Sequence, residues 1–351
     1  MNSVHRRFPP AIIFLAAILA VPRLLAWDHG GHTLVNLVAL ASLPVDFPEF
    51  VRTPANAERI GFLSGEPDRW SHALDLPLRH KDWLDHFCDL EQIPAAGLDF
   101  STLPSFRYDF VVAFAAARVA RPGNFPLIDA KRNSDHTQQW PGFLPWAVAE
   151  NYGRLKAAFS SLKAYEELGT KEEVANAQAT VVYWMGVLGH YVGDCAQPLH
   201  TTNHYNGWVG ENPNGYTTSN RFHTWVDSGF LNKAGITSGR KVPAVSPAAP
   251  ISLTSPAEGR DPVFVAALEF IRRQHRWVEP LYQMEKAGKL GLEQQPVTDE
   301  ARVFFERRLQ EGSEMLGALW LTAWRAAPRE AFLRGVLLKR NATTAGGTTI
   351  P

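Results

Sequence analysis

The spacing of hydrophobic positions along the chain predicts helices throughout the central region. Residues 33–42 (T-L-V-N-L-V-A-L-A-S) are apolar on nearly all sides, which is typical of a buried helix. No alternating run of the kind that predicts a strand stands out, and no internal repeat is visible. The predicted helices are 33–42, 106–121, 143–168, 170–197, 263–286 and 299–326. The sequence therefore predicts an all-α fold in a single multi-helix domain.

Local signals set the boundaries of these helices. Gly169 ends one long helix, and Thr170 with Glu173 predicts a capping box that starts the next. Glycines inside that second helix lower its stability, but they let another helix or an ion approach closely. These glycines are Gly186, Gly189 and Gly193. Residues 57–86 predict a short helix followed by loops, whereas 128–139, 201–216 and the proline-rich 242–262 predict irregular structure.

Composition and charge limit the classes of function. A chain of 351 residues with 45% hydrophobic residues can bury a large core. The 35 basic and 35 acidic residues balance, so the bulk composition lacks the basic face of a duplex-DNA binder. An anionic substrate would have to be held by bound metal.

The N-terminus predicts export. Two arginines precede the apolar run 11–21, which is too short to span a membrane, and a small residue, Ala26, follows. We expect a signal peptide over 1–26, a domain over 27–338 and a flexible Thr/Gly-rich tail over 339–351. The protein would then be secreted or periplasmic. The alternative is that residues 1–26 stay uncleaved as a membrane anchor.

Candidate metal ligands are concentrated in L-G-H-Y-V-G-D-C-A-Q-P-L-H (188–200). His190 and Asp194 lie four residues apart, so a helix places both on one face, where they can share a metal. Pro198 ends the helix, and His200 beyond it must point elsewhere. A second pair with the same spacing, His223 and Asp227, follows. One such pair is usually a surface hydrogen bond, but two pairs with a histidine between them predict a multi-zinc site, because zinc accepts imidazole and carboxylate ligands.

Further candidates lie in the first quarter of the chain. Cleavage after Ala26 would make Trp27 the new N-terminus, and its free α-amino group could bind zinc together with His32. Asp68 and His86 are the other candidates. His72 and His80 are alternatives to His86, and His204 could contact the substrate, although an exposed loop histidine is the simpler interpretation of it.

The two cysteines cannot form a thiolate zinc site or a disulfide framework. Cys88 lies two residues after His86, and Cys195 follows Asp194, so the thiols would be neighbours if those residues share a metal. Two buried free thiols are favoured over a disulfide between them.

With these residues assembled, the chain resembles the superfamily of zinc-dependent phospholipases C and single-strand nucleases of the P-one/S-one type. The most specific element is L-G-H-Y-V-G-D-x-x-Q-P-L-H, and H-F-C-D (86–89) and E-G-S-E-M-L-G-A-L-W-L (311–321) also match. The resemblance implies three zinc ions. It assigns Asp68, His86, His190 and Asp194 to the first, Trp27, His32 and the bridging Asp194 to the second, and His200, His223 and Asp227 to the third.

The resemblance also implies a mechanism and a substrate site. Two zincs sharing Asp194 would hold a bridging hydroxide that attacks phosphorus, Asp68 would orient it, and Phe87 with Asp89 would grip a nucleobase. The alternative for Phe87 is that its ring packs in the core. No protein partner is implied, and a monomer is expected.

The substrate stays open between single-stranded nucleic acid and phospholipid. Asp227 and H-F-C-D favour a nuclease that also acts on 3'-nucleotides. Three departures weigh against it: N-P-N-G-Y-T-T-S-N (212–220) replaces the nuclease Gly-Gly-Asn stretch, Ser71 stands where nucleases place an arginine, and a long insertion separates His86 from His190. A phospholipase C is the alternative, and a catalytically silent zinc-bound binding module is a third hypothesis.

Overall fold

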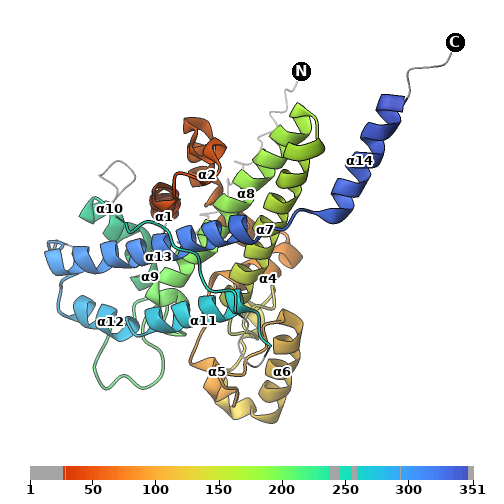
Figure 1. The fold of residues 1–351 in the computed structure, drawn as a ribbon. Helices are drawn as coiled ribbons and strands as arrows, with labels where there is room; N and C mark the ends of the chain where they lie inside the picture. The colour runs from red at the N-terminus through yellow and green to blue at the C-terminus, as the bar shows by residue number, and fades with distance from the viewer. Residues whose placement is uncertain (1–26, 28, 237–244, 255–258, 293, 347–351) are drawn as a thin grey trace, which may run out of the picture.

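The structure, a computed structural model, describes residues 27, 29–236, 245–254, 259–292 and 294–346 (Figure 1). These residues form helices joined by turns and loops; the β-structure among them is limited to isolated bridges such as Tyr205 with Gly207. The predicted all-α fold in one domain is confirmed. In chain order the α-helices are α1 (His29–Ser42), α2 (Pro54–Leu63), α3 (Glu66–Ser71), α4 (Leu76–Trp83), α5 (Gln92–Ala95), α6 (Arg107–Ala120), α7 (Leu144–Leu168), α8 (Lys171–Ala196), α9 (Phe222–Thr224), α10 (Phe230–Ala234), α11 (Pro262–His275), α12 (Val278–Lys286), α13 (Asp299–Ala326) and α14 (Ala331–Gly346). Short 3-10 turns are η1 (Glu49–Arg52), η2 (Leu84–His86), η3 (Pro122–Asn124), η4 (Ala130–Arg132) and η5 (Pro198–Thr201), and η6 (Trp225–Gly229) is a π-helical turn.

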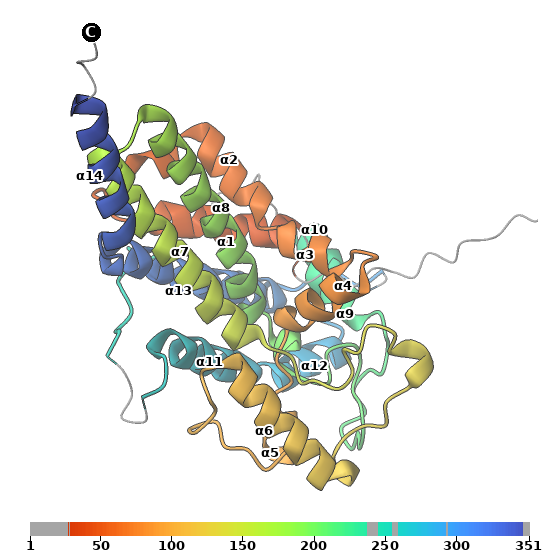
Figure 2. The same cartoon turned by 90° about the vertical axis from the view of Figure 1, so that its right-hand side faces the viewer.

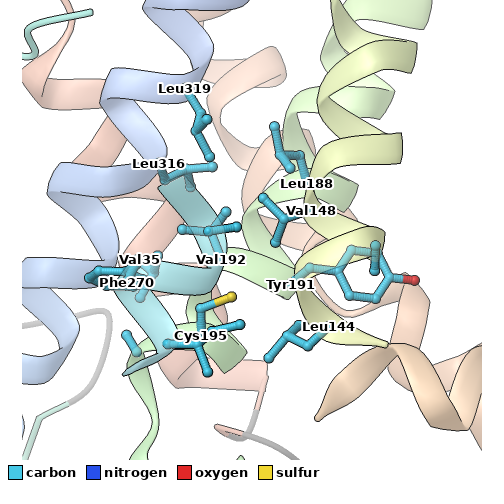
Figure 3. Close-up of a cluster of buried hydrophobic side chains, with 14 of the residues drawn as sticks. Val35, Leu144, Val148, Leu188, Tyr191, Val192, Cys195, Phe270, Leu316 and Leu319 are labelled. Carbon is cyan, nitrogen blue, oxygen red and sulfur yellow. The ribbon is translucent and has the colours of Figure 1, made fainter. Parts of the chain in front are cut away.

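The helix α8 lies at the centre of the molecule. It packs against α7, α13, α2 and α1, and α7 runs beside it because only a two-residue link joins them (Figures 1 and 2). Figure 3 shows Leu188 and Val192 of α8 in the buried cluster with Leu316 and Leu319 of α13. The ligand-bearing end of α8 is thereby held by helices from both ends of the sequence.

Glycines on α8 set how closely its neighbours approach. A Cβ added at Gly189 would lie 1.8 Å from Asn36 Oδ1 of α1, and one at Gly186 would lie 2.5 Å from Leu63 Cβ of α2. Any side chain at either position would push a packed helix away. The close approach predicted from these glycines is confirmed.

The region 57–86 is more helical than predicted. Instead of one short helix followed by loops, it contains most of α2 and all of α3, α4 and η2. The prediction was wrong because it took Gly61, Gly65, Pro67 and Pro77 as loop signals, whereas Pro67 and Pro77 occupy the first turns of α3 and α4. A proline is favourable there, since that backbone nitrogen has no intrahelical partner.

Two boundaries near the C-terminus also differ from the prediction. The helix predicted over 263–286 is divided into α11 and α12 by a turn at Arg276 and Trp277. This turn places the Trp277 ring against Phe304 and under the guanidinium of Arg308. The Cζ atom of Arg308 lies 4.5 Å from the centroid of the Trp277 ring. Periodicity alone does not reveal such a turn, because both halves keep their apolar face inward.

Part of the tail predicted to be flexible from residue 339 is helical instead, since α14 continues through residue 346. Leu337 is buried, and Arg340 pairs with Glu173 at the start of α8, so the helix is tied to the body. In both views α14 lies at the opposite end of the molecule from α5 and α6 (Figures 1 and 2). Within the described ranges, no helix is both long and apolar enough to cross a membrane. The predicted signal peptide over 1–26 lies outside the described residues.

Candidate metal centre

The helix α8 presents two candidate ligands on one buried face. His190 Nε2 lies 3.2 Å from Asp194 Oδ2, and both side chains are fully inaccessible to solvent. The helix starts at the predicted capping box, in which Thr170 and Glu173 each bond the other's backbone N–H, and ends at Ala196. The one-turn spacing predicted to bring His190 and Asp194 together is confirmed.

Two segments, η2 and α3, bring further candidate ligands to this pair. His86, on η2, places Nδ1 2.9 Å from His190 Nε2 and 3.2 Å from Asp194 Oδ2. Asp68, on α3, places Oδ1 3.8 Å from His86 Nδ1 and 3.9 Å from His190 Nε2. The four residues predicted for the first zinc therefore lie in one cluster.

His32 of α1 approaches the other oxygen of Asp194. Its Nε2 lies 3.4 Å from Asp194 Oδ1, while Oδ2 faces His86 and His190. Its ring also stacks on that of His190, with centroids 4.0 Å apart. The two oxygens of one carboxylate thus face two different sets of imidazoles, which is the arrangement a bridging ligand requires.

Trp27 is anchored close to the same point. Its ring is completely buried, and its Nε1 donates a hydrogen bond of 3.0 Å to the carbonyl of Gly193, the residue before Asp194. The ring also contacts Phe305 edge to face at 5.9 Å. Trp27 therefore lies beside the cluster, whereas the cleavage that would free its α-amino group falls in the segment outside the described residues.

A third group lies beyond the end of α8. Pro198 starts the turn η5, which carries His200, and the joined turns α9 and η6 carry His223 and Asp227. His223 Nε2 lies 2.9 Å from Asp227 Oδ2 and 3.1 Å from His200 Nε2. Gln197 Nε2 donates to the other oxygen, Asp227 Oδ1, at 2.7 Å. The predicted change of direction after Pro198 is confirmed.

Backbone carbonyls fix the orientation of two of the rings. His190 Nδ1–H donates to the carbonyl of Ser64 at 2.7 Å, and His200 Nδ1–H donates to the carbonyl of His86 at 2.6 Å. Since a carbonyl only accepts, each ring has a proton on Nδ1 and points Nε2 toward the cluster. Metal-binding histidines are commonly oriented in this way.

The donor atoms of these groups fit bound metal ions. Buried polar atoms normally have a hydrogen-bond partner, and a buried ionised carboxylate without one is costly. The buried atoms that lack a hydrogen bond here are His32 Nδ1 and Nε2, His86 Nε2, both oxygens of Asp194, His223 Nδ1 and Asp227 Oδ2. Three buried groups have ligand atoms within 4.8 Å of one another: His32 with Asp68 and His190; His86 with His190 and Asp194; and His200 with His223 and Asp227. Each group could hold a metal ion.

Burial and charge set the protonation of the cluster. Burial alone would lower the pKa of His190, but the carboxylates of Asp194 and Asp68 outweigh it and raise that pKa to about 9. Burial alone would raise the pKa of Asp194, but His190 and His200 hold it well below its usual value. Burial lowers the pKa of His32 well below the usual value and lowers that of His200. Asp194 therefore stays ionised, as a metal ligand must be.

A cleft of about 520 Å³ opens onto the cluster. It is lined by Asp68, His86, His200 and His223 together with the partly buried ring of Phe87. A larger hollow of about 820 Å³ elsewhere is lined by none of the predicted ligands. The smaller cleft is thus the route by which a substrate can reach both the first and the third group.

Asp89 lies in the wall of this cleft. Its side chain is 7% exposed, its Oδ2 accepts a hydrogen bond of 2.8 Å from Gln92 Nε2, and its Oδ1 has no hydrogen-bond partner. Burial, and then the charge of Glu91, raise its pKa well above the usual value. An unsatisfied acceptor in a cleft can receive an N–H from a ligand.

The segment that the resemblance predicts to be an insertion between His86 and His190 supplies one wall of the cleft. Its segment 122–143 returns to the site through Gly142, which has φ +88°; a Cβ there would lie 2.1 Å from the carbonyl oxygen of Phe87. The Asp89 N–H also donates to the carbonyl of Pro141 at 2.6 Å. Phe87 and Asp89 are therefore held in place by the insertion.

The alternative histidines have other partners. His72 Nδ1–H donates to the carbonyl of Asp68 at 2.7 Å, so it supports a ligand and lines the cleft. His80 Nδ1–H donates to the carbonyl of Asp135 at 2.8 Å, outside the cluster. His204 stacks on a tryptophan ring 4.0 Å away in its own loop. His86, rather than His72 or His80, is the histidine that the structure brings to the cluster.

Both cysteines are free and buried, as favoured from the sequence. Burial raises the pKa of both thiols far above the usual value. Both belong to the buried hydrophobic core, and the Cys195 side chain is visible among apolar neighbours in Figure 3. Neither thiol is in the ionised form that binds metal at neutral pH.

Supporting residues were missed in the sequence. Gln197 Oε1 accepts from the N–H of Leu199 at 2.6 Å while its amide nitrogen holds Asp227, so one side chain joins the turn η5 to the third group. An amide residue directly before a helix-ending proline is the available signal for such a role. The carbonyl of Ser64 leaves no signal in the sequence, because any residue supplies a carbonyl.

Comparison of the sequence with models of known protein families and with curated proteins gives no match in either case.

Proposed function

We propose that this protein is a secreted, zinc-dependent phosphodiester hydrolase that acts preferentially on single-stranded nucleic acid and 3'-nucleotides. The observation that carries the proposal is the position of Asp194, whose Oδ1 faces His32 while its Oδ2 faces His86 and His190. The third group shares the same cleft through His200 and His223. Imidazole and carboxylate donors without thiolate suit Zn²⁺, and closely spaced metal groups are typical of phosphoester hydrolysis.

A different set of residues would hold each of the three ions. Asp68, His86, His190 and Asp194 would hold the first ion, His32 and Asp194 with the freed amino group of Trp27 the second, and His200, His223 and Asp227 the third. When bound, the ions would lower the pKa of water and neutralise charge on phosphate and leaving oxygen. Asp68 lies at the cleft surface, 8% exposed, and would orient the attacking oxygen.

The residues in the wall of the cleft favour a substrate that carries a nucleobase next to the phosphate. Phe87 offers a partly exposed ring for stacking, and Asp89 offers an unsatisfied buried acceptor for the N–H groups on a base edge. Stacking on aromatic rings with edge hydrogen bonds is how proteins bind unpaired bases. A duplex cannot present a base in this way without unpairing it, so single strands are favoured.

A second candidate, a phospholipase C, is favoured by one observation at the mouth of the cleft. Leu127 is 99% exposed and Val209 is 49% exposed, and both line the same cleft. Exposed apolar side chains at the entrance of a site can contact a lipid surface. Phospholipid is therefore the competing substrate.

Parallel assays test the proposal. The chain beginning at Trp27 is analysed for zinc and assayed on single-stranded DNA, RNA, phosphatidylcholine vesicles and bis(p-nitrophenyl) phosphate. We expect about three zinc ions per chain and turnover of both nucleic acids in preference to lipid. Lipid turnover without nucleic-acid cleavage would reverse the choice of substrate, and bound zinc with no turnover of any substrate would leave a silent binding module.

A further inference from the structure

One wall of the cleft carries its two permanent positive charges. Among the described residues that line the cleft, Arg79 of α4 and Arg132 of the insertion are the only arginines or lysines. Arg132 is largely exposed, with its side chain 84% accessible, whereas that of Arg79 is 43% accessible. Arg79 is thus the cation that the structure holds in a defined place.

Asp135 of the insertion fixes the position of Arg79. Its Oδ2 lies 3.0 Å from Arg79 Nε, and its other oxygen accepts from the hydroxyl of Thr137 at 2.9 Å. Its carbonyl accepts from His80 Nδ1–H, so the residue is tied to α4 at two points. Asp135 is 7% exposed, and its carboxylate therefore acts as a rigid anchor.

The terminal nitrogens of Arg79 remain available for a ligand. The ion pair uses Nε, and no hydrogen bond within the described ranges involves either Nη atom. The guanidinium carbon lies 5.6 Å from the ring centroid of Trp83. That ring meets His72 edge to face at 5.8 Å, and His72 bonds the carbonyl of Asp68. A short row of contacts thus joins Arg79 to a ligand of the first metal group.

We propose that Arg79, positioned by Asp135, binds a second phosphate of an oligonucleotide while the metal centre binds the phosphate to be cleaved. The inference rests on the proposed function and specifies its substrate as a chain of at least two phosphodiesters. A guanidinium with two free terminal nitrogens can bind phosphate oxygens in a bidentate manner. The choline headgroup of a phospholipid would instead place a positive charge against the positive charge of Arg79.

The chain offers a closely matched control in Arg69. Its side chain is 44% accessible, its Nη1 pairs with Glu66 at 2.8 Å, and its guanidinium lies 4.4 Å from the Phe62 ring. It differs from Arg79 in not lining the cleft. The variants Arg79→Gln and Arg69→Gln therefore remove the same charge from similar surroundings.

The test compares ligands with one and three phosphodiesters. Binding of fluorescently labelled d(TpT) and d(TpTpTpT) is measured by anisotropy over a range of salt, with zinc loaded and after chelation. We expect Arg79→Gln to weaken tetranucleotide binding about tenfold and to lower the salt slope by about 0.7, with a several-fold smaller effect on d(TpT). Arg79→Lys should keep the slope and recover part of the affinity.

A double variant separates phosphate binding from folding. Arg79→Gln alone leaves the carboxylate of Asp135 without its ion-pair partner, whereas Arg79→Gln/Asp135→Asn removes both charges and keeps the net charge of the protein. The tenfold loss should persist in this variant, with unchanged zinc content.

Several outcomes would overturn the inference. These are equal losses for both ligands, a similar loss in Arg69→Gln, or weaker binding only to phosphatidylserine vesicles, which would assign the arginine to lipid. Failure of wild-type protein to hydrolyse bis(p-nitrophenyl) phosphate would count against the proposed function, whatever the result at Arg79.

Discussion

Gly193 of α8 lies directly against the ring of His32 on α1. A Cβ added at Gly193 would be 2.6 Å from His32 Nδ1 and 3.1 Å from its Cε1. The His32 ring also stacks on the ring of His190, with centroids 4.0 Å apart. Because Gly193 has no side chain, the ring of His32 on α1 can lie beside Asp194.

The variant Gly193→Ala should displace His32 and weaken the second metal group. Both elements are packed helices, so the added methyl group cannot be accommodated without moving the ring. We expect the zinc content to fall by about one ion and turnover to fall about 100-fold, because misplacement by about 1 Å is enough for such a loss. Metal analysis and steady-state kinetics provide the measurements.

Gly153→Ala is the matched control for this substitution. Gly153 lies within α7, and a Cβ there would have no atom within 4 Å. Alanine in a helix interior is more favourable than glycine by about 1 kcal/mol, so this variant should be more stable and keep its zinc. Full zinc content and activity in Gly193→Ala would show that His32 is not a required ligand.

Asp194→Asn should remove two ions and leave the third. Asp194 Oδ2 faces His86 and His190, and its Oδ1 faces His32. His200 approaches Oδ1 to 3.6 Å with Nδ1, which donates to a backbone carbonyl, whereas its Nε2 faces the third group. Native mass spectrometry should show one zinc and almost no turnover. Asp227→Asn is the reciprocal variant and should lose only the third ion; loss of all ions from either variant would contradict separate groups.

Local patterns in the sequence predicted most of the cluster correctly. His190, Asp194 and His200 were placed from helical spacing and one proline, and the structure confirms their relative directions. The same reasoning failed for 57–86, where prolines in first turns were taken as loop signals. The spacing rules describe neighbours along one helix, and they do so reliably because that geometry is local.

Contacts between distant segments could not be predicted in this way. The choice of His86 over His80 depends on which side of α4 and η2 faces α8, and that depends on tertiary packing. The ion pair of Arg79 with Asp135 joins a helix to an insertion across 56 residues of sequence. Neither contact can be recognised from a periodic pattern in the sequence, because histidine, arginine and aspartate are all common at protein surfaces.

The thiols of Cys88 and Cys195 should be unreactive in the native protein. Both are 1% exposed, and burial raises the pKa of each far above the usual value, so almost no thiolate is present at neutral pH. Titration with a disulfide reagent should detect no thiol in native protein and two in denaturant. Fewer than two in denaturant would reveal a disulfide.

Removal of metal should destabilise the fold. Chelation would leave the buried carboxylates of Asp194 and Asp227 facing histidines without the ions that the groups can hold. Each ion contributes on the order of 4 kcal/mol at a thousand-fold excess over its Kd, so scanning calorimetry should show a clearly lower Tm that zinc restores. The variant Asp194→Asn/Asp227→Asn should respond much less to chelator. An equal decrease in both proteins would indicate an effect unrelated to these groups.

Phe87→Ala should mainly weaken binding of nucleic acid. The ring lines the cleft beside Asp89, and stacking of one base on an aromatic ring contributes about 1–3 kcal/mol. Kinetics on a single-stranded oligonucleotide should show KM raised about tenfold or more, with a much smaller change in kcat. Phe62→Ala serves as the control, since that ring is 47% exposed and outside the cleft. Unchanged KM in Phe87→Ala would mean that the ring only packs against the core, and would remove it from the substrate site.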